Sequence, residues 1–129
     1  MLVRLVRGTA RMVTGLIGRR HPANVRVQTL TATIGIRGTD FEVAVIPEDT
    51  PDARAGVYDL VHDGATNIRL TQMDRSLDVK KNQTAFAPDK PKPGEEPLQI
   101  LKETPIFLQQ GGGLDALIQS ITIQVPMFR

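Results

Sequence analysis

Few side chains in this sequence could carry out acid–base chemistry, and their spacing argues against it. His21 and His62 are the only histidines, and His62 directly precedes Asp63. Neighbouring residues of a strand point to opposite faces, so a His62–Asp63 pair would rarely cooperate. A convergence of Asp40, Asp59 and Asp63 in space is the remaining support for an enzyme. We therefore predict no catalytic residues and a chain that is not an enzyme.

Nucleophiles and metal ligands are equally scarce. The chain has no cysteine, which excludes disulfides, thiolate metal sites and thiol nucleophiles. Its only serines, Ser76 and Ser120, stand in no nucleophile motif. Glu48, Asp49 and Asp52 could bind calcium weakly, but they lack the regular spacing of a calcium-binding loop. A solvated acidic loop is the better interpretation, and we predict no metal ion and no cofactor.

The stretch TATIGIRGTDFEV, residues 31–43, suggests a different kind of site, because Gly35 and Gly38 flank Arg37 in an otherwise apolar segment. A glycine loop that cradles phosphate needs a strand before it and a helix after it. Here the strand-like sequence DFEVAVI follows instead. We therefore reject a phosphate site and interpret the stretch as architecture.

Five residues of this stretch are predicted to form a structural corner: Gly35, Arg37, Gly38, Thr39 and Asp40. The alternation of apolar residues changes parity across them, and such a change requires a bulge or a corner. Gly35 would let another layer approach closely, and Gly38 would supply an unusual backbone angle. Thr39 and Asp40 would cap the turn. Arg37 would pair with Asp40 or with a carboxylate of the acidic segment that follows.

Most of the remaining chain alternates apolar and polar residues, which is the period of a strand. VYDLVHDGATNIRL resembles a hairpin with its turn at Asp63-Gly64. Residues 76–86 predict a strand, a turn and a second strand, and ITIQVPMF predicts a final strand. The pattern therefore predicts an all-β fold of short antiparallel strands, in a sandwich or a solenoid-like stack, with one short helix near 113–120.

Composition and charge narrow the function classes. Aromatic residues make up only 4% of the 129 residues, so valine, isoleucine and leucine must fill the core. Residues 1–40 carry seven arginines against one acid, whereas residues 41–63 carry six acids against one arginine. This asymmetry could mark a nucleic-acid-binding arm, but no aromatic residues are interleaved for base stacking. We favour two segments that lie side by side and neutralise each other, and we predict no nucleic-acid partner.

The N-terminal sequence MLVRLVRGTARMVTGLIG superficially resembles a signal peptide. Arg4, Arg7 and Arg11 interrupt its apolar run and no small-residue cleavage site follows, so we interpret it as mature protein. No stretch of the sequence is long and apolar enough to span a membrane. The Pro-rich segment 88–97 is predicted to be a linker or loop between a β-domain, residues 1–87, and a C-terminal extension, residues 98–129.

Residues 25–41 resemble the most recognisable segment of the FecR domain family, a bacterial extracytoplasmic domain. GVYDLVHDGATNI and LDVKKNQTAF resemble its strand–Gly–strand and closing units, with Asn82-Gln83 where Gly-Gln is usual. Asparagine tolerates a positive φ better than other non-glycine residues, so the same turn is feasible. The resemblance covers residues 3–87 and corresponds to the later part of the domain. The matching residues are Val25-Arg26-Val27, Thr29, Thr31 to Ile36, and Arg37-Gly38-Thr39-Asp40-Phe41.

The resemblance implies an all-β fold, export beyond the cytoplasmic membrane and no enzymatic activity. The best-known members contact a TonB-dependent transporter and control a sigma factor, but this chain has no sigma-binding segment and no transmembrane helix. We expect a non-catalytic interaction module, in FecR-like signalling or envelope binding, that binds a protein or polymer through an exposed sheet edge or face, with Val57–Val61 as the candidate edge. The alternative is a self-assembling fibre subunit, in which the strand SITIQVPMFR is donated to a neighbouring copy.

Overall fold

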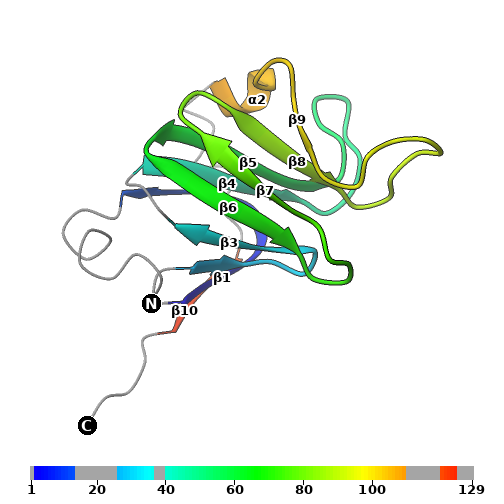
Figure 1. The fold of residues 1–129 in the computed structure, drawn as a ribbon. Coiled ribbons are helices and arrows are strands. Elements are labelled where there is room, and N and C mark those ends of the chain that lie inside the picture. The colour runs from blue at the N-terminus through cyan, green and yellow to red at the C-terminus, as the bar shows by residue number, and fades with distance from the viewer. Residues whose placement is uncertain (1, 14–25, 37–39, 110–119, 125–129) are drawn as a thin grey trace, which may run out of the picture.

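The computed structural model describes residues 2–13, 26–36, 40–109 and 120–124 of the chain (Figure 1). Within them the fold is all-β with one short helix, which confirms the predicted fold class. The elements are β1 (Leu2–Val13), β2 (Arg26–Gln28), β3 (Ala32–Ile36), β4 (Asp40–Ile46), β5 (Gly56–Asp63), β6 (Ala65–Leu70), β7 (Ser76–Lys80), β8 (Thr84–Pro88), β9 (Gln99–Ile100), α2 (Ile106–Gln109) and β10 (Ser120–Gln124).

The strands form one nearly closed mixed sheet because β1 belongs to both of its halves. The residues Leu2–Arg4 pair with β2 and with β10, whereas Gly8–Val13 pair with β4. Gly8 has a φ of 97°, a backbone angle that favours glycine, and it lies where β1 passes from one half to the other. We call β10–β1–β2–β3–β6–β7 the first half-sheet and β1–β4–β5–β8–β9 the second half-sheet.

One pairing differs from the predicted antiparallel arrangement, because β1 and β2 run parallel. Parallel neighbours need a crossover connection of a dozen or more residues, whereas antiparallel neighbours need only a short turn. Residues 14–25 provide that length of chain between β1 and β2. The sheet is therefore mixed, with this parallel pair next to the point where β1 turns.

The parity change in TATIGIRGTDFEV corresponds to a change of half-sheet. Ile34 and Ile36 are buried in β3, which pairs with β2 and β6. Phe41 and Val43 are buried in β4, which pairs with β1 and β5. Residues 37–39, which join the two strands, lie outside the described residues. The shift from even to odd positions therefore keeps both strands facing the same core.

The predicted hairpin at Asp63-Gly64 is wrong, although the turn itself is present. Gly64 has a φ of 83° and its amide donates to Asp63 Oδ1 at 3.1 Å. However, β5 pairs with β4 and β8 in the second half-sheet, whereas β6 pairs with β3 and β7 in the first. The Asp–Gly turn therefore carries the chain across the core, and the two strands that flank it do not pair.

The two half-sheets enclose an aliphatic core, as the low aromatic content predicts. Figure 1 shows β6 and β7 in front of β4 and β5, and these layers are in contact across the interior. A second, smaller cluster of buried side chains lies on the outer face of the second half-sheet, where α2 covers it. The fully buried side chains of the inner core include Leu5, Val27, Ile34, Phe41, Val43, Val57, Val61, Ile68 and Val79.

The Pro-rich segment between β8 and β9 is tied to the second half-sheet by an ion pair. Arg54 Nη1 and Nη2 donate to the two carboxylate oxygens of Glu95, at 2.6 and 2.9 Å. These bonds, together with the amide of Lys92, lower the pKa of Glu95 to about 2. Leu98, at the end of the segment, is buried in the inner core. Residues 98–100 therefore continue the same folded body.

Asp59 is an exception to the aliphatic core. It lies on β5 between Val57 and Val61, is fully buried, and bonds to Thr66 Oγ1 of β6 at 2.5 Å. Its Oδ1 atom receives no hydrogen bond from the residues that the structure describes. Burial raises the pKa of Asp59 to about 7, although the bond from Thr66 opposes this shift. The Asp59 carboxyl group therefore links β5 of the second half-sheet to β6 of the first half-sheet through their shared interior.

The start of β5 leaves no room for a side chain. Gly56 has a φ of 146°, and a Cβ placed there would lie 2.4 Å from the carbonyl oxygen of Ala87. We expect Gly56→Ala to lower the free energy of unfolding by about 2–4 kcal/mol, because it adds a clash to backbone strain. Gly94→Ala is the matched control, since Gly94 has a φ of 80° but open space around it. Equal losses in urea denaturation would contradict this reasoning.

The buried carboxyl predicts a pH dependence of stability. The folded-state pKa of Asp59 lies above the unfolded value of 3.8, so its favourable contribution is complete below pH 4. As the pH rises from 4 to 7, this contribution to the free energy of unfolding decreases by up to about 4 kcal/mol. Above pH 7 it does not return. Asp59→Asn is neutral throughout and should flatten this decline, as measured by denaturant unfolding from pH 4 to pH 8.

Exposed Asp52 provides the control for this experiment. Asp52→Asn should leave the wild-type decline between pH 4 and pH 7 unchanged. If Asp59→Asn loses stability with pH as steeply as the wild type does, Asp59 does not titrate in this range.

Candidate functional site

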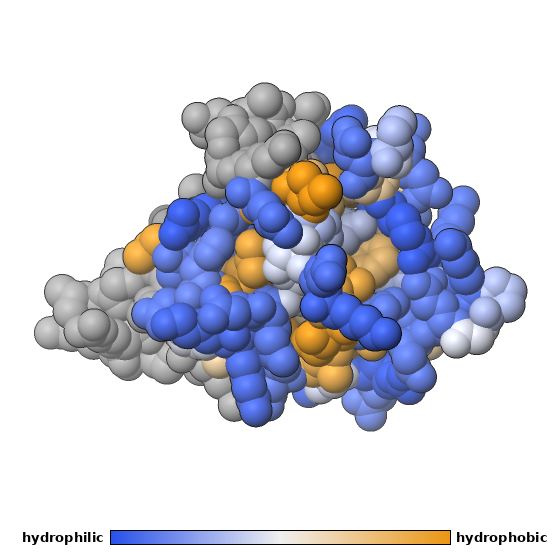
Figure 2. All heavy atoms as spheres, turned by 90° about the horizontal axis from the view of Figure 1, so that it is seen from above, coloured by the Kyte–Doolittle hydropathy of each residue, from blue (hydrophilic) through white to orange (hydrophobic). Residues whose placement is uncertain are grey.

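A cavity of about 650 Å³ opens on the outer face of the second half-sheet, beside α2. Figure 2 shows the molecule from the side that carries α2 and β9, where hydrophobic patches alternate with hydrophilic side chains. The walls come from β1, β4 and β5, from the turn before β8 and from residues 103–109. We call this site the outer cavity, and its lining residues are Arg11, Glu42, Leu60, His62, Asn82, Glu103, Thr104, Leu108 and Gln109.

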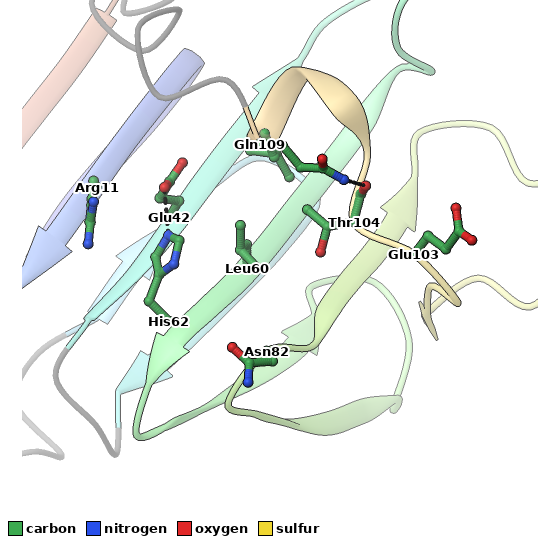
Figure 3. A pocket seen from close by; sticks show the side chains of 9 residues that line it. Arg11, Glu42, Leu60, His62, Asn82, Glu103, Thr104 and Gln109 are labelled. Carbon is green, nitrogen blue, oxygen red and sulfur yellow. Dashed lines mark hydrogen bonds and ion pairs between the residues drawn. The ribbon is translucent and has the colours of Figure 1, made fainter.

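A row of polar side chains crosses three strands at one end of the outer cavity. Arg11 of β1 lies opposite Glu42 of β4 in the strand register. His62 of β5 faces the same carboxylate, and its Nε2 lies 2.6 Å from Glu42 Oε1 (Figure 3). The alternation of side chains along each strand places all three on the outer face, away from the inner core.

Arg11 is committed to a different carboxylate. Its Nε and Nη2 donate to Asp40 Oδ1 and Oδ2 at 2.9 and 2.7 Å, in a two-pronged ion pair. The hydrogen bond lowers the pKa of Asp40 and raises that of Arg11. The Arg11 side chain is 46% exposed, so the pair contributes little to stability and mainly fixes the position of the guanidinium.

The opposite end of the outer cavity is built from backbone turns that bond to one another. Gln109 Nε2 donates to the carbonyl oxygen of Thr104 at 2.7 Å, as Figure 3 shows. Thr104 Oγ1 lies 2.9 Å from Thr84 Oγ1, which ties the segment before α2 to β8. Asn82 has a φ of 69° in the turn before β8, which fits the expectation for an asparagine in place of glycine.

Apolar side chains form the floor beneath this end. Leu108 of α2 is buried against the outer face, next to Leu60. Tyr58 and Phe86 stack with ring centroids 4.4 Å apart, and Phe107 meets Tyr58 edge-on at 5.0 Å. These contacts explain why four residues suffice for a helix here, since packing stabilises it. The predicted helix near 113–120 lies outside the described residues, except for Ser120, which begins β10.

The predicted structural motif is only partly described. Arg37, Gly38 and Thr39 lie outside the described residues. The close approach of another layer to Gly35 is wrong for the described part of the chain, since a Cβ there would meet only the Asn67 carbonyl oxygen, at 3.9 Å. Asp40 lies at the edge of the candidate site, where it is paired with Arg11 of β1.

The residues considered for catalysis do not converge. Asp40 and Asp63 are opposite each other in the register of β4 and β5, but Asp59 lies in the inner core with Thr66. His62 contacts Glu42 across the strands and not its neighbour Asp63. His21 lies outside the described residues. The geometry therefore separates Asp59 from Asp40 and Asp63.

The acidic loop before β5 and the predicted sheet edge at Val57–Val61 are two further candidate sites from the sequence. Asp49 Oδ1 accepts the Ala55 amide at 2.8 Å, so it closes the loop before β5. No group of three or more possible ligands, from histidine, aspartate or glutamate, gathers in the described part of the chain. Val57–Val61 do not form an edge, because β5 pairs with both β4 and β8. None of the described helices is long and apolar enough to cross a membrane.

Sequence reasoning missed the central residue of the site, Glu42. It interrupts the apolar strand DFEVAVI and is 3% exposed, although it lies on the outer face. A glutamate between Phe41 and Val43 was the available signal. What the sequence cannot supply is the pairing of β1, β4 and β5, which brings Arg11 and His62 to it.

Several polar groups around the outer cavity already have partners. Arg11 is held by Asp40, and Thr104 and Gln109 bond to each other and to β8. Of the polar side-chain atoms that line the cavity, Glu42 Oε2 is buried and receives no hydrogen bond from any described group. A carboxylate oxygen in that position is an acceptor ready for an incoming donor.

Removal of the apolar floor should be measurable. Leu108→Ala is expected to lower the free energy of unfolding by about 2–4 kcal/mol, because the leucine is buried between α2 and β5. Ile106→Ala, on the same helix but 70% exposed, should cost less than about 0.5 kcal/mol. Tyr58 is the only tyrosine and there is no tryptophan, so tyrosine fluorescence reports this site directly. Equal effects of the two variants would show that α2 does not pack here.

Comparison with known proteins identifies no relative. The chain gives no significant match to any protein-family model, curated protein or solved structure. The FecR resemblance therefore stays a prediction from the sequence. The function rests on the outer cavity and on the chemistry of the residues that line it.

Proposed function

We propose that this chain is a non-catalytic, extracytoplasmic β-domain that binds a protein partner at the outer cavity, in FecR-like signalling or in envelope binding. The supporting observation is the open outer cavity, whose polar side chains are held by one another and leave a buried acceptor in Glu42. Mutually bonded groups present a fixed surface to a partner, and a fixed surface loses less conformational entropy on binding. The FecR resemblance supports the location outside the cytoplasm.

The surroundings of the outer cavity also suit a protein partner. Leu60 and Leu108 provide apolar surface at its centre, while Arg11 and Glu103 lie at its margin. Protein-binding sites commonly combine an apolar centre with a polar rim. The site lies on the face of a sheet, whereas the strand β5 that we expected to act as an edge is fully paired. We therefore assign partner capture to this face.

Site-specific crosslinking in the producing bacterium tests this proposal. A photoreactive amino acid at Glu103, exposed at the rim, should give one discrete crosslinked envelope protein. The same group at Arg69, exposed on the outer face of the first half-sheet, is the matched control and should give none. Equal crosslinking from both positions, or none from Glu103, would contradict the assignment.

Self-assembly is the alternative outcome of the same experiment. In the structure, β10 pairs antiparallel with Leu2–Arg7 of its own chain, so fibre formation requires this strand to be exchanged between copies. Crosslinked products at multiples of the chain mass of 14.2 kDa would favour such exchange over capture of a different protein.

A further inference from the structure

The inference begins with one carboxylate oxygen of Glu42, to which no described group donates a hydrogen bond. The Glu42 side chain is 4% exposed, and only its Oε1 atom has a partner, His62. Leaving a buried acceptor without a hydrogen bond costs about 1–3 kcal/mol, and more when the group is charged. A fold rarely retains such an atom without a reason. Because Glu42 lines the outer cavity, a ligand in the cavity can supply the missing donor.

The nearest cation does not supply it. Arg11 lies opposite Glu42, but both of its bonding nitrogens are directed at Asp40. Among the residues that line the outer cavity, Arg11 is a cation that is already paired with Asp40, whereas Glu42 and Glu103 are acids. The excess of acid favours a cationic donor over a neutral one.

The apolar part of the site fits the stem of such a cation. Leu60 projects from β5 in Figure 3, and Leu108 of α2 lines the same cavity and belongs to the same buried cluster. Lysine and arginine place their methylene stems along apolar surface and extend only the charged end to a polar partner. A cavity of about 650 Å³ accommodates one such side chain with its flanking backbone.

We propose that the outer cavity binds a lysine or arginine side chain of the partner protein, with its cationic group donating to Glu42 Oε2. This inference rests on the proposed function, since it names the chemistry by which the partner is recognised. His62 is a positioning residue in this arrangement, because it holds Oε1 of the carboxylate and leaves Oε2 without a described partner. The methylene stem packs on Leu60 and Leu108.

The test compares two small peptides by NMR titration of the full, isotope-labelled chain. N-acetyl-lysine methylamide carries the ammonium group, and N-acetyl-norleucine methylamide has the same stem without it. The lysine peptide should shift the amide signals of Glu42, Leu60 and His62 with a Kd in the range of about 1–10 mM. The norleucine peptide should bind at least about tenfold more weakly, because it cannot donate to the carboxylate.

A matched pair of variants adds a second measurement. Glu42→Gln keeps the shape of the side chain but removes its charge, and it should weaken lysine-peptide binding at least about tenfold. Glu48→Gln makes the same chemical change in an exposed loop and should leave binding unchanged. The two peptides are compared on the wild-type chain, so the test holds even if Glu42→Gln fails to fold.

Two outcomes would overturn the inference: equal binding of the lysine and norleucine peptides, or unchanged binding to Glu42→Gln. A crosslinked partner at Glu103 together with either outcome would leave the proposed function standing and reject only this chemistry. Selective lysine binding without any crosslinked protein would support the ligand chemistry and reject the proposed protein partner. Failure of the cationic-ligand inference and failure of the proposed protein-binding function therefore give different results.

Discussion

The pairing of β1 with strands on both sides of the core is the constraint on which the rest of the structure depends. Its first residues complete one half-sheet and its last residues begin the other, with Gly8 at the change of direction. Several later connections then pass from one half-sheet to the other. The connection between β3 and β4 and the Asp63-Gly64 turn between β5 and β6 both do so. Side-chain parity, burial and turn position all follow from that geometry.

The same closure leaves an apolar face on the outside of the second half-sheet, and this face is only partly covered where the outer cavity lies. The outer face of the second half-sheet carries Leu60, Tyr58 and Phe86, which would otherwise be exposed. The segment after β9 covers part of this face with Leu108, and beyond α2 the polar row of Arg11, Glu42 and His62 remains in contact with the cavity. A face that is half core and half polar surface is suited to recognition, since it offers apolar area next to an oriented charge.

The sequence predicts the parts of this architecture that depend on local pattern. Alternation identified the strands, and the parity difference between Ile36 and Phe41 coincides with the change from the first half-sheet to the second. Local pattern does not say which strands pair, so the Asp–Gly turn looked like a hairpin when it is a crossing between layers. For the same reason Glu42 gave only a weak signal, because Arg11 and His62 are distant in sequence and meet it through strand register. Helix α2 is too short for periodicity, and its packing against Tyr58 determines it.

The pairing of β10 with β1 has a consequence for the order of folding. Within the described residues, Leu2–Arg7 pair antiparallel with residues 120–124, which follow them after all the other strands of the sheet. Contacts between such distant residues form slowly, because the chain loses the entropy of closing a long loop before the contacts contribute favourable free energy. A ribosome makes the N-terminal strand first, so β1 is synthesised early and receives this neighbour last. During that interval the first half-sheet has an unprotected edge, and any strand that reaches it competes with the chain's own terminus.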